Sequence, residues 1–410
     1  MPHFPRRAAL LAAVLLPGIA SAAPLSLEQA QALARQASAA VRAAQAGELS
    51  AAEAARAAGQ LPDPVLSAGI DNLPITGRDR LSTAADSMTM KRVGLNQEWL
   101  PADKRAAQRA AAQALAEREA GLAHTAIADT RLQVALAYVD AYYATQASAL
   151  AAQAEHHGRE ELAAARARLA TASGSGAEAL AMESALGLAQ DDMAEARQAQ
   201  RQAGLLLQRW TGLPTDELEP PLLPTAAEQA AFVARHPAVA AARRDVEVAR
   251  QDASLARANR RPNWTWGISY GQRPGNPDML SFGVSIPIPV APAQRQDREA
   301  AARLALVDKA EAALAEAERA ATAEYLALAD EAGRLAERLA RYGTAVLEPA
   351  AQRTAAALAG YRANQNALSA LFEARHAETT ARRRQVSLQR DLARVQAQLV
   401  FKPLAEGDAP

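Results

Sequence analysis

The sequence predicts a mainly α-helical chain that carries two β-hairpins and repeats its plan once. Half of the residues are hydrophobic but only 4% are aromatic, because alanine, the best helix former, dominates the composition. Within two segments, 65–99 and 263–289, large apolar residues instead alternate with small or polar ones, which is the period of a strand with one apolar face. Similar motifs occur in the same order in both halves of the chain, which indicates a tandem duplication.

Residues 1–22 have the pattern of a secretory signal peptide. Arg6 and Arg7 precede an apolar run at 8–19, and small residues that end at Ala22 form the expected cleavage site. The run is too short to span a membrane as a helix. The sequence contains no cysteine, so it allows neither a disulfide nor a lipidated N-terminal cysteine. We therefore expect a chain that leaves the cytoplasm and enters any membrane by its strands.

The first repeat is expected to span residues 23–213. It contains an alanine-rich helix, the first hairpin and two long helices, with the expected ranges 26–59, 65–99, 102–172 and 177–210. Pro101 opens the first long helix, because proline is well placed in a first turn. At about 1.5 Å per residue this helix would be roughly 100 Å long. Its large apolar residues fall on one narrow face, and a rod of this length must pack that stripe against neighbouring helices.

A proline-rich linker at 214–225 leads to the second repeat, at 226–400. That repeat is expected to contain a helix, the second hairpin and two long helices, with the ranges 226–260, 263–289, 293–359 and 367–400. Residues 401–410 are expected to form a tail that frays. Gly158 of the first repeat aligns with Pro349 of the second. Because either residue weakens a helix locally, we predict a bend or a change of coiling at both positions.

The second hairpin has the stricter alternation of the two. Trp264, Trp266 and Tyr270 lie on the apolar face of its first arm, and Phe282 lies on that of its second arm. Each arm has roughly the ten residues needed to cross a bilayer at a tilt. These four aromatic residues are therefore candidates for anchors at the membrane interface.

Two hairpins supply four strands, which are too few to close a barrel. Membrane barrels begin at about eight strands, and an open sheet edge cannot face lipid. Two copies of the chain would give eight strands and three would give twelve, and the residues alone do not choose between these numbers. The joint solution for strands and helices is a hollow oligomer, in which a strand barrel in the outer membrane continues into a helical tube in the periplasm.

Several segments carry a resemblance to a known family. Arg261-Pro262 precedes the second hairpin, and residues 282–289 read Phe-Gly-Val-Ser-Ile-Pro-Ile-Pro before a long helix. The segments 176–180 and 361–374 lie at the two expected helical turns. Over essentially its full mature length the chain resembles the TolC family of outer membrane efflux channels. The resemblance implies a homotrimer with a twelve-stranded β-barrel, a periplasmic α-helical barrel, and docking to a periplasmic adaptor (membrane fusion) protein and an inner-membrane efflux pump.

The function that this resemblance implies is conduction of substrate to the cell exterior through an outer membrane channel. The segments 61–64 and 88–97 are most similar to the heavy-metal cation efflux branch of the family. A periplasmic coiled-coil adaptor or a structural rod without a channel is the alternative. Adaptors carry one helical hairpin flanked by β-rich domains, whereas this chain has two hairpins of bilayer length, which argues against that alternative.

The resemblance also implies a gate at the helical turns, which form the periplasmic mouth in the family. Glu373 falls on one of the family's mouth carboxylates, and Ala370 replaces another. Glu178 is the counterpart in the first repeat, and Tyr361 matches a gating tyrosine. A ring of like charges in a narrow tube would favour cations and resist tight closure. Alternatively, these glutamates are ordinary solvated residues of a helix face.

Other classes of function are not indicated. The 45 basic and 45 acidic residues balance, so no nucleic-acid partner is expected. No phosphate loop or pairing of a nucleophile with a base stands out, and we expect neither an enzyme nor a cofactor. His156 and His157 point about 100° apart on a helix and are better explained as exposed residues than as metal ligands. Met88 and Met90 share a face of the expected strand and could offer soft thioethers, but a role in the barrel wall or a loop is favoured.

Overall fold

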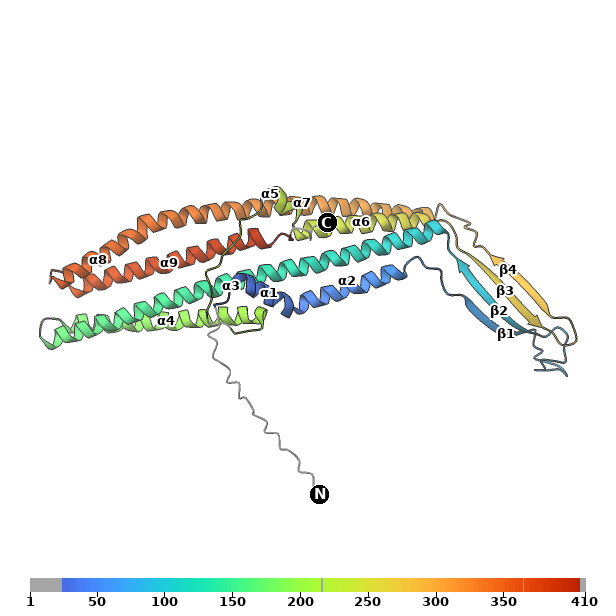
Figure 1. Ribbon diagram of the computed structural model, residues 1–410, viewed down its shortest axis with the longest axis horizontal. Coiled ribbons are helices and arrows are strands. Elements are labelled where there is room, and N and C mark those ends of the chain that lie inside the picture. The colour runs from blue at the N-terminus through green and yellow to red at the C-terminus, as the bar shows by residue number, and fades with distance from the viewer. Residues whose placement is uncertain (1–23, 215–216, 364, 406–410) are drawn as a thin grey trace, which may run out of the picture.

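The computed structural model describes residues 24–214, 217–363 and 365–405. The expected signal peptide, with its cleavage site at Ala22, lies outside these residues. The molecule is elongated, with its helices running along the long axis and a small sheet at one end (Figure 1). The predicted mainly helical fold with a small antiparallel sheet is confirmed. Among the described helices, none combines the length and the apolar character that a transmembrane helix requires.

The order of elements in the first half of the chain recurs in the second half. The first half contains α1 (Leu27–Ala37), α2 (Ala39–Ala57), β1 (Val65–Asp71), β2 (Met90–Trp99), α3 (Ala102–Ala170) and α4 (Gly176–Thr211). The second contains α5 (Gln229–Ala234), α6 (Pro237–Ala258), β3 (Trp264–Gln272), β4 (Met279–Ser285), α7 (Gln296–Tyr342), a π-helical turn (Gly343–Leu347), α8 (Glu348–Arg362) and α9 (Leu368–Phe401). Each half therefore supplies one β-hairpin and one long helical hairpin.

The two β-hairpins form one antiparallel sheet in the order β1-β2-β3-β4. The halves of the chain meet where β2 pairs with β3, from Trp99 opposite Trp264 to Lys91 opposite Gln272. β4 ends at Ser285 rather than near residue 289, because prolines at 287 and 289 lack the N–H groups that a ladder requires. The expected strand at Met88 is also wrong, since that residue lies in a turn before β2.

The helices α1 and α2 replace the single helix expected at 26–59. Ser38 separates them, and its hydroxyl accepts a hydrogen bond from the backbone N–H of Val41, which caps α2. In the second half, the helix expected at 226–260 is likewise divided, between α5 and α6. There His236 caps α6 and Pro237 occupies the first turn, where a missing N–H has no cost.

The predicted change of coiling is confirmed at Pro349 but is wrong at Gly158. The π-helical turn ends immediately before α8, whose first turn contains Pro349. Proline lacks an N–H and clashes with the preceding turn, so the α-helical bonding pattern is interrupted there. Gly158 keeps its N–H, and α3 remains α-helical through it. A Cβ at Gly158 would lie 3.4 Å from Cδ1 of Leu186, which is ordinary van der Waals contact, so Gly158 lies where α3 packs against α4.

α3 is the central helix of the molecule and packs against α1, α2, α4, α6 and α9. The core around it contains the fully buried Tyr138, whose hydroxyl lies 2.6 Å from the carbonyl oxygen of Leu25 and 2.8 Å from that of Glu219. Ion pairs extend the packing between halves of the chain, as between Arg394 of α9 and Asp140 of α3. The two helical hairpins are therefore joined along much of their length.

The end of α9 is packed rather than frayed. Phe401 and Leu404 are buried, and the N–H of Leu404 donates a 2.9 Å hydrogen bond to the carbonyl oxygen of Arg235. The expectation that the chain frays from residue 401 is therefore wrong for 401–405, because apolar burial holds this segment. The remainder of the expected tail lies outside the described residues.

Candidate functional site

Both helical hairpins turn at the end of the molecule that lies farthest from the sheet (Figure 1). We call this region the turn end, and it comprises the turn at 171–175 between α3 and α4 and the turn between α8 and α9. At the first of these, Ser175 caps α4 by accepting a 3.1 Å hydrogen bond from the N–H of Glu178. The N–H of Ser173 donates to the carbonyl oxygen of Arg168 at 2.9 Å, which closes α3. Local hydrogen bonds thus define where this hairpin ends.

An apolar cluster lies directly behind the two turns. It contains Leu162, Ala165, Ala179 and Met182 from the first helical hairpin, and Ala357, Leu368, Leu371 and Ala374 from the second. Tyr361 and Phe372 are partly buried against it. Four of the eight buried side chains are alanines, which limits the apolar area that the contact between the hairpins buries. Polar contacts beside the cluster therefore contribute to the stability of the contact between the two helical hairpins.

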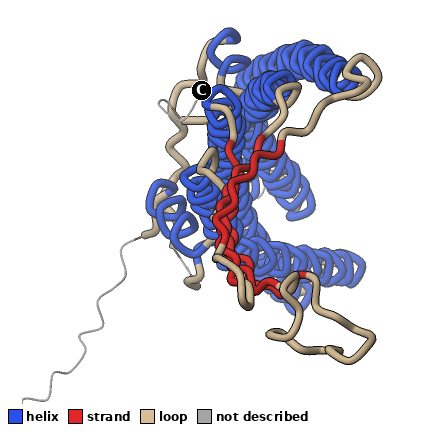
Figure 2. The backbone as a smooth tube through the Cα atoms, turned by 90° about the vertical axis from the view of Figure 1, so that its right-hand side faces the viewer, coloured by secondary structure: helices blue, strands red, loops and turns tan. Residues whose placement is uncertain are grey.

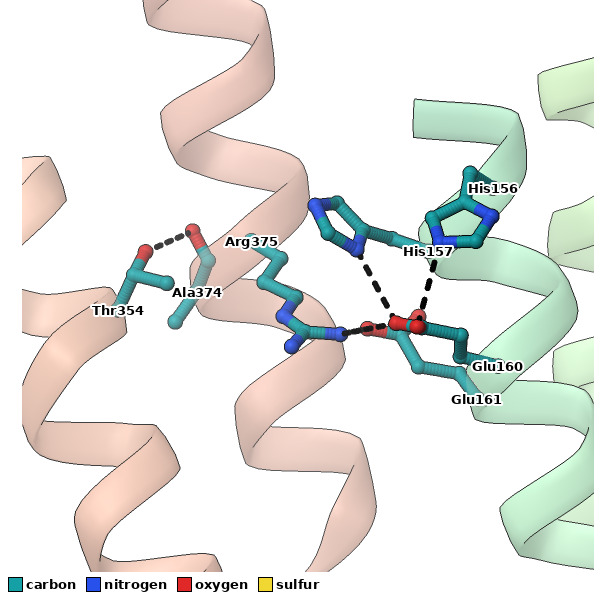
Figure 3. A network of polar contacts seen from close by, with 7 residues as sticks. All are labelled: His156, His157, Glu160, Glu161, Thr354, Ala374 and Arg375. Carbon is teal, nitrogen blue, oxygen red and sulfur yellow. Dashed lines mark hydrogen bonds and ion pairs between the residues drawn. The ribbon is translucent and has the colours of Figure 1, made fainter. Parts of the chain in front are cut away.

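The main polar contact is an ion pair between α9 and α3 (Figure 3). Nη1 of Arg375 donates a 3.1 Å hydrogen bond to Oε1 of Glu161, and it also lies 3.9 Å from Oε2 of Glu160. The Glu161 side chain is only 5% exposed. Burial raises the pKa of Glu161, while the neighbouring Arg375 guanidinium opposes that rise. We call Arg375, Glu160 and Glu161 the cross-hairpin lock.

Two histidines extend the lock on the α3 side (Figure 3). Nδ1 of His157 and Nε2 of His156 each lie 3.3 Å from an oxygen of Glu160. The hydrogen bond from His157 is the main cause that lowers the pKa of Glu160, and the charges of His156 and Arg375 act in the same direction. The adjacent histidines thus both face one carboxylate. In the described part of the chain, no group of three or more His, Cys, Asp or Glu side chains has a metal-binding arrangement.

The sequence-predicted gate residues all lie at the turn end but are not brought together. Glu373 is on α9, about 200° around the helix from Arg375, with its side chain 68% exposed and 3.9 Å from Nη2 of Arg353. Glu178 lies in the first turn of α4 and is half-buried. Tyr361 lies near the end of α8 against the apolar cluster. Within one chain, then, the candidate gate residues Glu178 and Glu373 lie on separate helical hairpins.

The sequence reasoning missed Glu161 and Arg375. A signal for both was available, because each occupies a position on an apolar stripe. Glu161 falls three residues after Gly158 and four before Ala165, both buried, and Arg375 falls four residues after the buried Leu371. An ionisable residue on a buried stripe requires a partner. Sequence alone, however, does not say that the two residues are partners of each other.

A second candidate surface is the apolar face of the sheet. Trp264, Trp266, Tyr270 and Phe282 share this face and are 42%, 41%, 48% and 75% exposed, respectively. The sheet extends beyond the ends of the helices (Figure 1 and Figure 2), so that among the described elements no helix covers this face or the opposite one. The outer edges of β1 and β4 pair with no other strand in the described part of the chain. The sheet thus has an uncovered apolar face and two open edges, which present unpaired backbone groups.

Solved structures of membrane proteins share this arrangement. The outer membrane protein VceC of Vibrio cholerae matches with a TM-score of 0.75 and 17% identity, covering 92% of this chain and 95% of that one. The MtrE outer membrane channel of Neisseria gonorrhoeae matches with a TM-score of 0.77 and 18% identity, over 92% and 88% of the two chains. The CmeC outer membrane channel of Campylobacter jejuni matches with a TM-score of 0.76 and 12% identity, over 92% and 85%.

The similarity is one of fold. No family model matches the sequence, and no curated protein matches it. The long helical hairpins and the small sheet nevertheless superpose over nearly the whole described chain. The protomer fold predicted from the resemblance to the TolC family, mainly helical with a small antiparallel sheet, is thereby confirmed.

Proposed function

We propose that this chain, which has the fold of the outer membrane efflux channels, is itself the outer membrane channel of a tripartite efflux system. It would conduct substrate from a periplasmic adaptor and an inner-membrane pump to the exterior. The observation that carries the proposal is the sheet with an uncovered apolar face and two open edges. Such a face is stable against lipid, and such edges are stable only when strands of other copies pair with them.

A homotrimer with a twelve-stranded barrel is the assembly that the fold supports best. Three copies of the four-stranded sheet would close the barrel, with the aromatic face toward lipid and Trp264 and Trp266 near the periplasmic rim. The helices would continue the barrel as a tube extending into the periplasm. The turn end would then form the periplasmic mouth, where an adaptor protein and the pump dock.

The proposed gate is the set of Glu373, Glu178 and Tyr361, with the cross-hairpin lock behind it. Their common location at the turn end supports this role. Copies related by threefold symmetry would place like carboxylates around one axis. Their mutual repulsion would oppose closure of the mouth, and their negative charge would attract cations. The bond between Arg375 and Glu161 would resist separation of the two helical hairpins, so the lock would favour the narrow state of the mouth.

Heavy-metal cations are the cargo class that we propose, from the segments 61–64 and 88–97. The test is the growth of a deletion strain on metal salts and on organic drugs. Sensitivity to metals alone would support this cargo. Sensitivity to drugs alone would contradict it while leaving the channel role in place.

The channel role itself is tested by fractionation and electrophysiology. The full-length protein, expressed with its own N-terminus, should fractionate with the outer membrane and purify in detergent as a trimer by light scattering. Reconstituted in a planar bilayer, it should give discrete single-channel currents. A detergent-free soluble monomer without conductance would contradict the proposal and favour the adaptor or rod.

A further inference from the structure

The polar face of the sheet carries very few charged side chains. Cross-strand pairing places alternate residues of all four strands on this face, and most of them are Gly, Ser, Thr or Asn. Within the strands, the ionisable residues on it are Asp71, Arg92 and Glu98. Arg92 is the only basic one of the three. Because this face carries only one basic and two acidic strand residues among small neutral ones, each of these charges contributes strongly to its electrostatic potential.

Arg92 lies between two glycines of the neighbouring strands, and the space on its β1 side is open. The residues opposite Arg92 on the two neighbouring strands are both glycines, Gly69 on β1 and Gly271 on β3. A Cβ at Gly69 would have no atom within 4 Å. A Cβ at Gly271 would instead clash with Sδ of Met90, so the thioether of Met90 covers Gly271. Arg92 is therefore the one charged side chain at this level of β1, β2 and β3, with open space toward β1 and Met90 toward β3.

Arg92 is paired with Asp71 by two contacts. Nε of Arg92 lies 3.2 Å from Oδ2 of Asp71, and Nη2 donates to Oδ1 at 3.3 Å. This two-point contact fixes the plane of the guanidinium against the carboxylate. Asp71 ends β1, so the pair lies at the end of the sheet away from the helices (Figure 1). Glu98 lies at the other end, where Nδ2 of Asn263 donates to it at 2.7 Å.

We infer that Arg92 and Asp71 together determine the ion preference of the outer part of the pore. The inference rests on the proposed channel function, because the polar face lines the interior only if the sheet closes into a membrane barrel. Each protomer then contributes one positive and one negative group at the same level. The pair holds this section close to electroneutral, so that charged cargo of either sign passes it. Loss of one partner leaves a ring of uncompensated charge, one per protomer, within a confined passage.

If Arg92 and Asp71 only stabilised the sheet, their substitution would have a different effect on the channel. A cross-strand ion pair also helps to fix register, and half-exposed pairs contribute little stability. If that were its whole role, loss of Arg92 would alter stability without altering the ratio of cation to anion permeability. Selectivity is therefore the readout that separates the two roles.

The experiment measures reversal potentials in planar bilayers under a KCl gradient at about 0.1 M, where the Debye length is about 10 Å. We expect Arg92→Gln to raise the permeability ratio of K⁺ to Cl⁻ at least about threefold and Asp71→Asn to lower it, since each leaves one sign of charge unpaired. The double variant should return to the wild-type ratio. Arg92→Lys keeps the charge and should remain close to wild type.

Lys91→Gln is the matched control. It removes the same charge at the neighbouring position of β2, but on the opposite, apolar face of the sheet, so the ratio should not change. If Arg92→Gln does not assemble, Asp71→Asn alone decides the outcome. Conducting channels with an unchanged ratio in both variants would overturn this inference and leave the channel role intact. Absence of any wild-type current would remove the channel role and this inference with it.

Discussion

The ammonium group of Lys104 donates a 2.7 Å hydrogen bond to the side-chain oxygen of Asn263, which joins the start of α3 to the start of β3. Lys104 also donates to the carbonyl oxygen of Arg261 at 2.8 Å, and Asn263 in turn donates to Glu98. Lys104 is buried, and burial lowers its pKa. This group thus connects both halves of the chain at the junction of sheet and helices.

Substitution of Lys104 by Met should weaken that junction. The variant leaves the partly buried oxygen atoms of Arg261 and Asn263 without this donor, and we expect a loss of about 1 kcal/mol in the free energy of unfolding. The measurement is thermal or denaturant unfolding of the detergent-solubilised protein. Lys309→Met, at an exposed position of α7, is the control and should remain within about 0.5 kcal/mol of wild type. Equal effects of the two substitutions would show that the junction contributes nothing specific.

For the cross-hairpin lock we expect that removing Arg375 alone destabilises the protein more than removing Arg375 and Glu161 together. Arg375→Met leaves the carboxylate of Glu161 buried without its cation and should cost about 3 kcal/mol. The penalty should shrink as the pH falls, because the pKa of Glu161 is already raised by burial and protonation removes the unpaired charge. Adding Glu161→Gln should recover much of the loss and abolish this pH dependence.

A control ion pair and a measurement of channel opening test the role of the cross-hairpin lock further. Arg334→Met breaks an exposed pair with Asp330 on α7 and should cost less than about 1 kcal/mol. In bilayers, Arg375→Met should increase the time that the channel spends open. An open probability equal to that of wild type would limit Arg375 to a structural role.

We expect removal of the proposed gate carboxylates, Glu373 and Glu178, to change the conductance of the channel. Glu373→Ala, alone or combined with Glu178→Ala, should alter the single-channel current or reduce its preference for cations, because each removes negative charge from the proposed entrance. Glu331→Ala on the exposed surface of α7, remote in sequence from both turns, is the matched control. Unchanged currents in the double variant would assign both glutamates to an ordinary solvated helix face.

His236 predicts a loss of stability at acidic pH. Its ring is buried beside Phe232, its Nε2 lies 3.3 Å from Oε2 of Glu324, and Lys402 pairs with the same glutamate. Burial lowers the pKa of His236 below its ordinary value of 6.5, Lys402 adds to that effect and Glu324 opposes it. The unfolded chain therefore takes up the proton first, so stability should fall as the pH decreases from 6.5 through the folded-state pKa.

The variant His236→Asn should retain the cap on α6 and lose this pH dependence, because asparagine is a good N-cap residue that does not titrate. Melting temperatures at pH 7.5 and about pH 5 provide the comparison. His376→Asn, at an exposed position of α9, should keep the wild-type dependence. If His236→Asn also keeps it, another group is responsible.

The sheet could be predicted from sequence because its period is local. Residues 264–270 alternate strictly, and alternation fixes which face each side chain occupies. The long helices were equally accessible, because alanine content and the spacing of prolines define them. The π-helical turn followed from Pro349, whose effect is confined to its own helix.

The lock could not be predicted, because it depends on packing between distant helices. Glu161 and Arg375 are 214 positions apart, and neither has a local pattern that names the other. The change of coiling predicted at Gly158 does not occur, since glycine keeps its backbone N–H and α3 is packed against α4 at that position. The prediction of a frayed tail was wrong for 401–405 because Leu404 is buried against Ala240, near the start of α6, and Ala128 of α3, a contact that composition does not reveal.

The pairing of β2 with β3 has a consequence for biogenesis. The two strands lie side by side, yet Glu98 and Asn263 at their junction are 165 positions apart in the chain. During export the edge of β2 therefore stays unpaired until the helices between β2 and β3 have been exported. An exposed edge is a template for mispairing with other chains. A nascent molecule of this architecture needs a holding chaperone until its second half arrives, and truncation after residue 213 should yield aggregates.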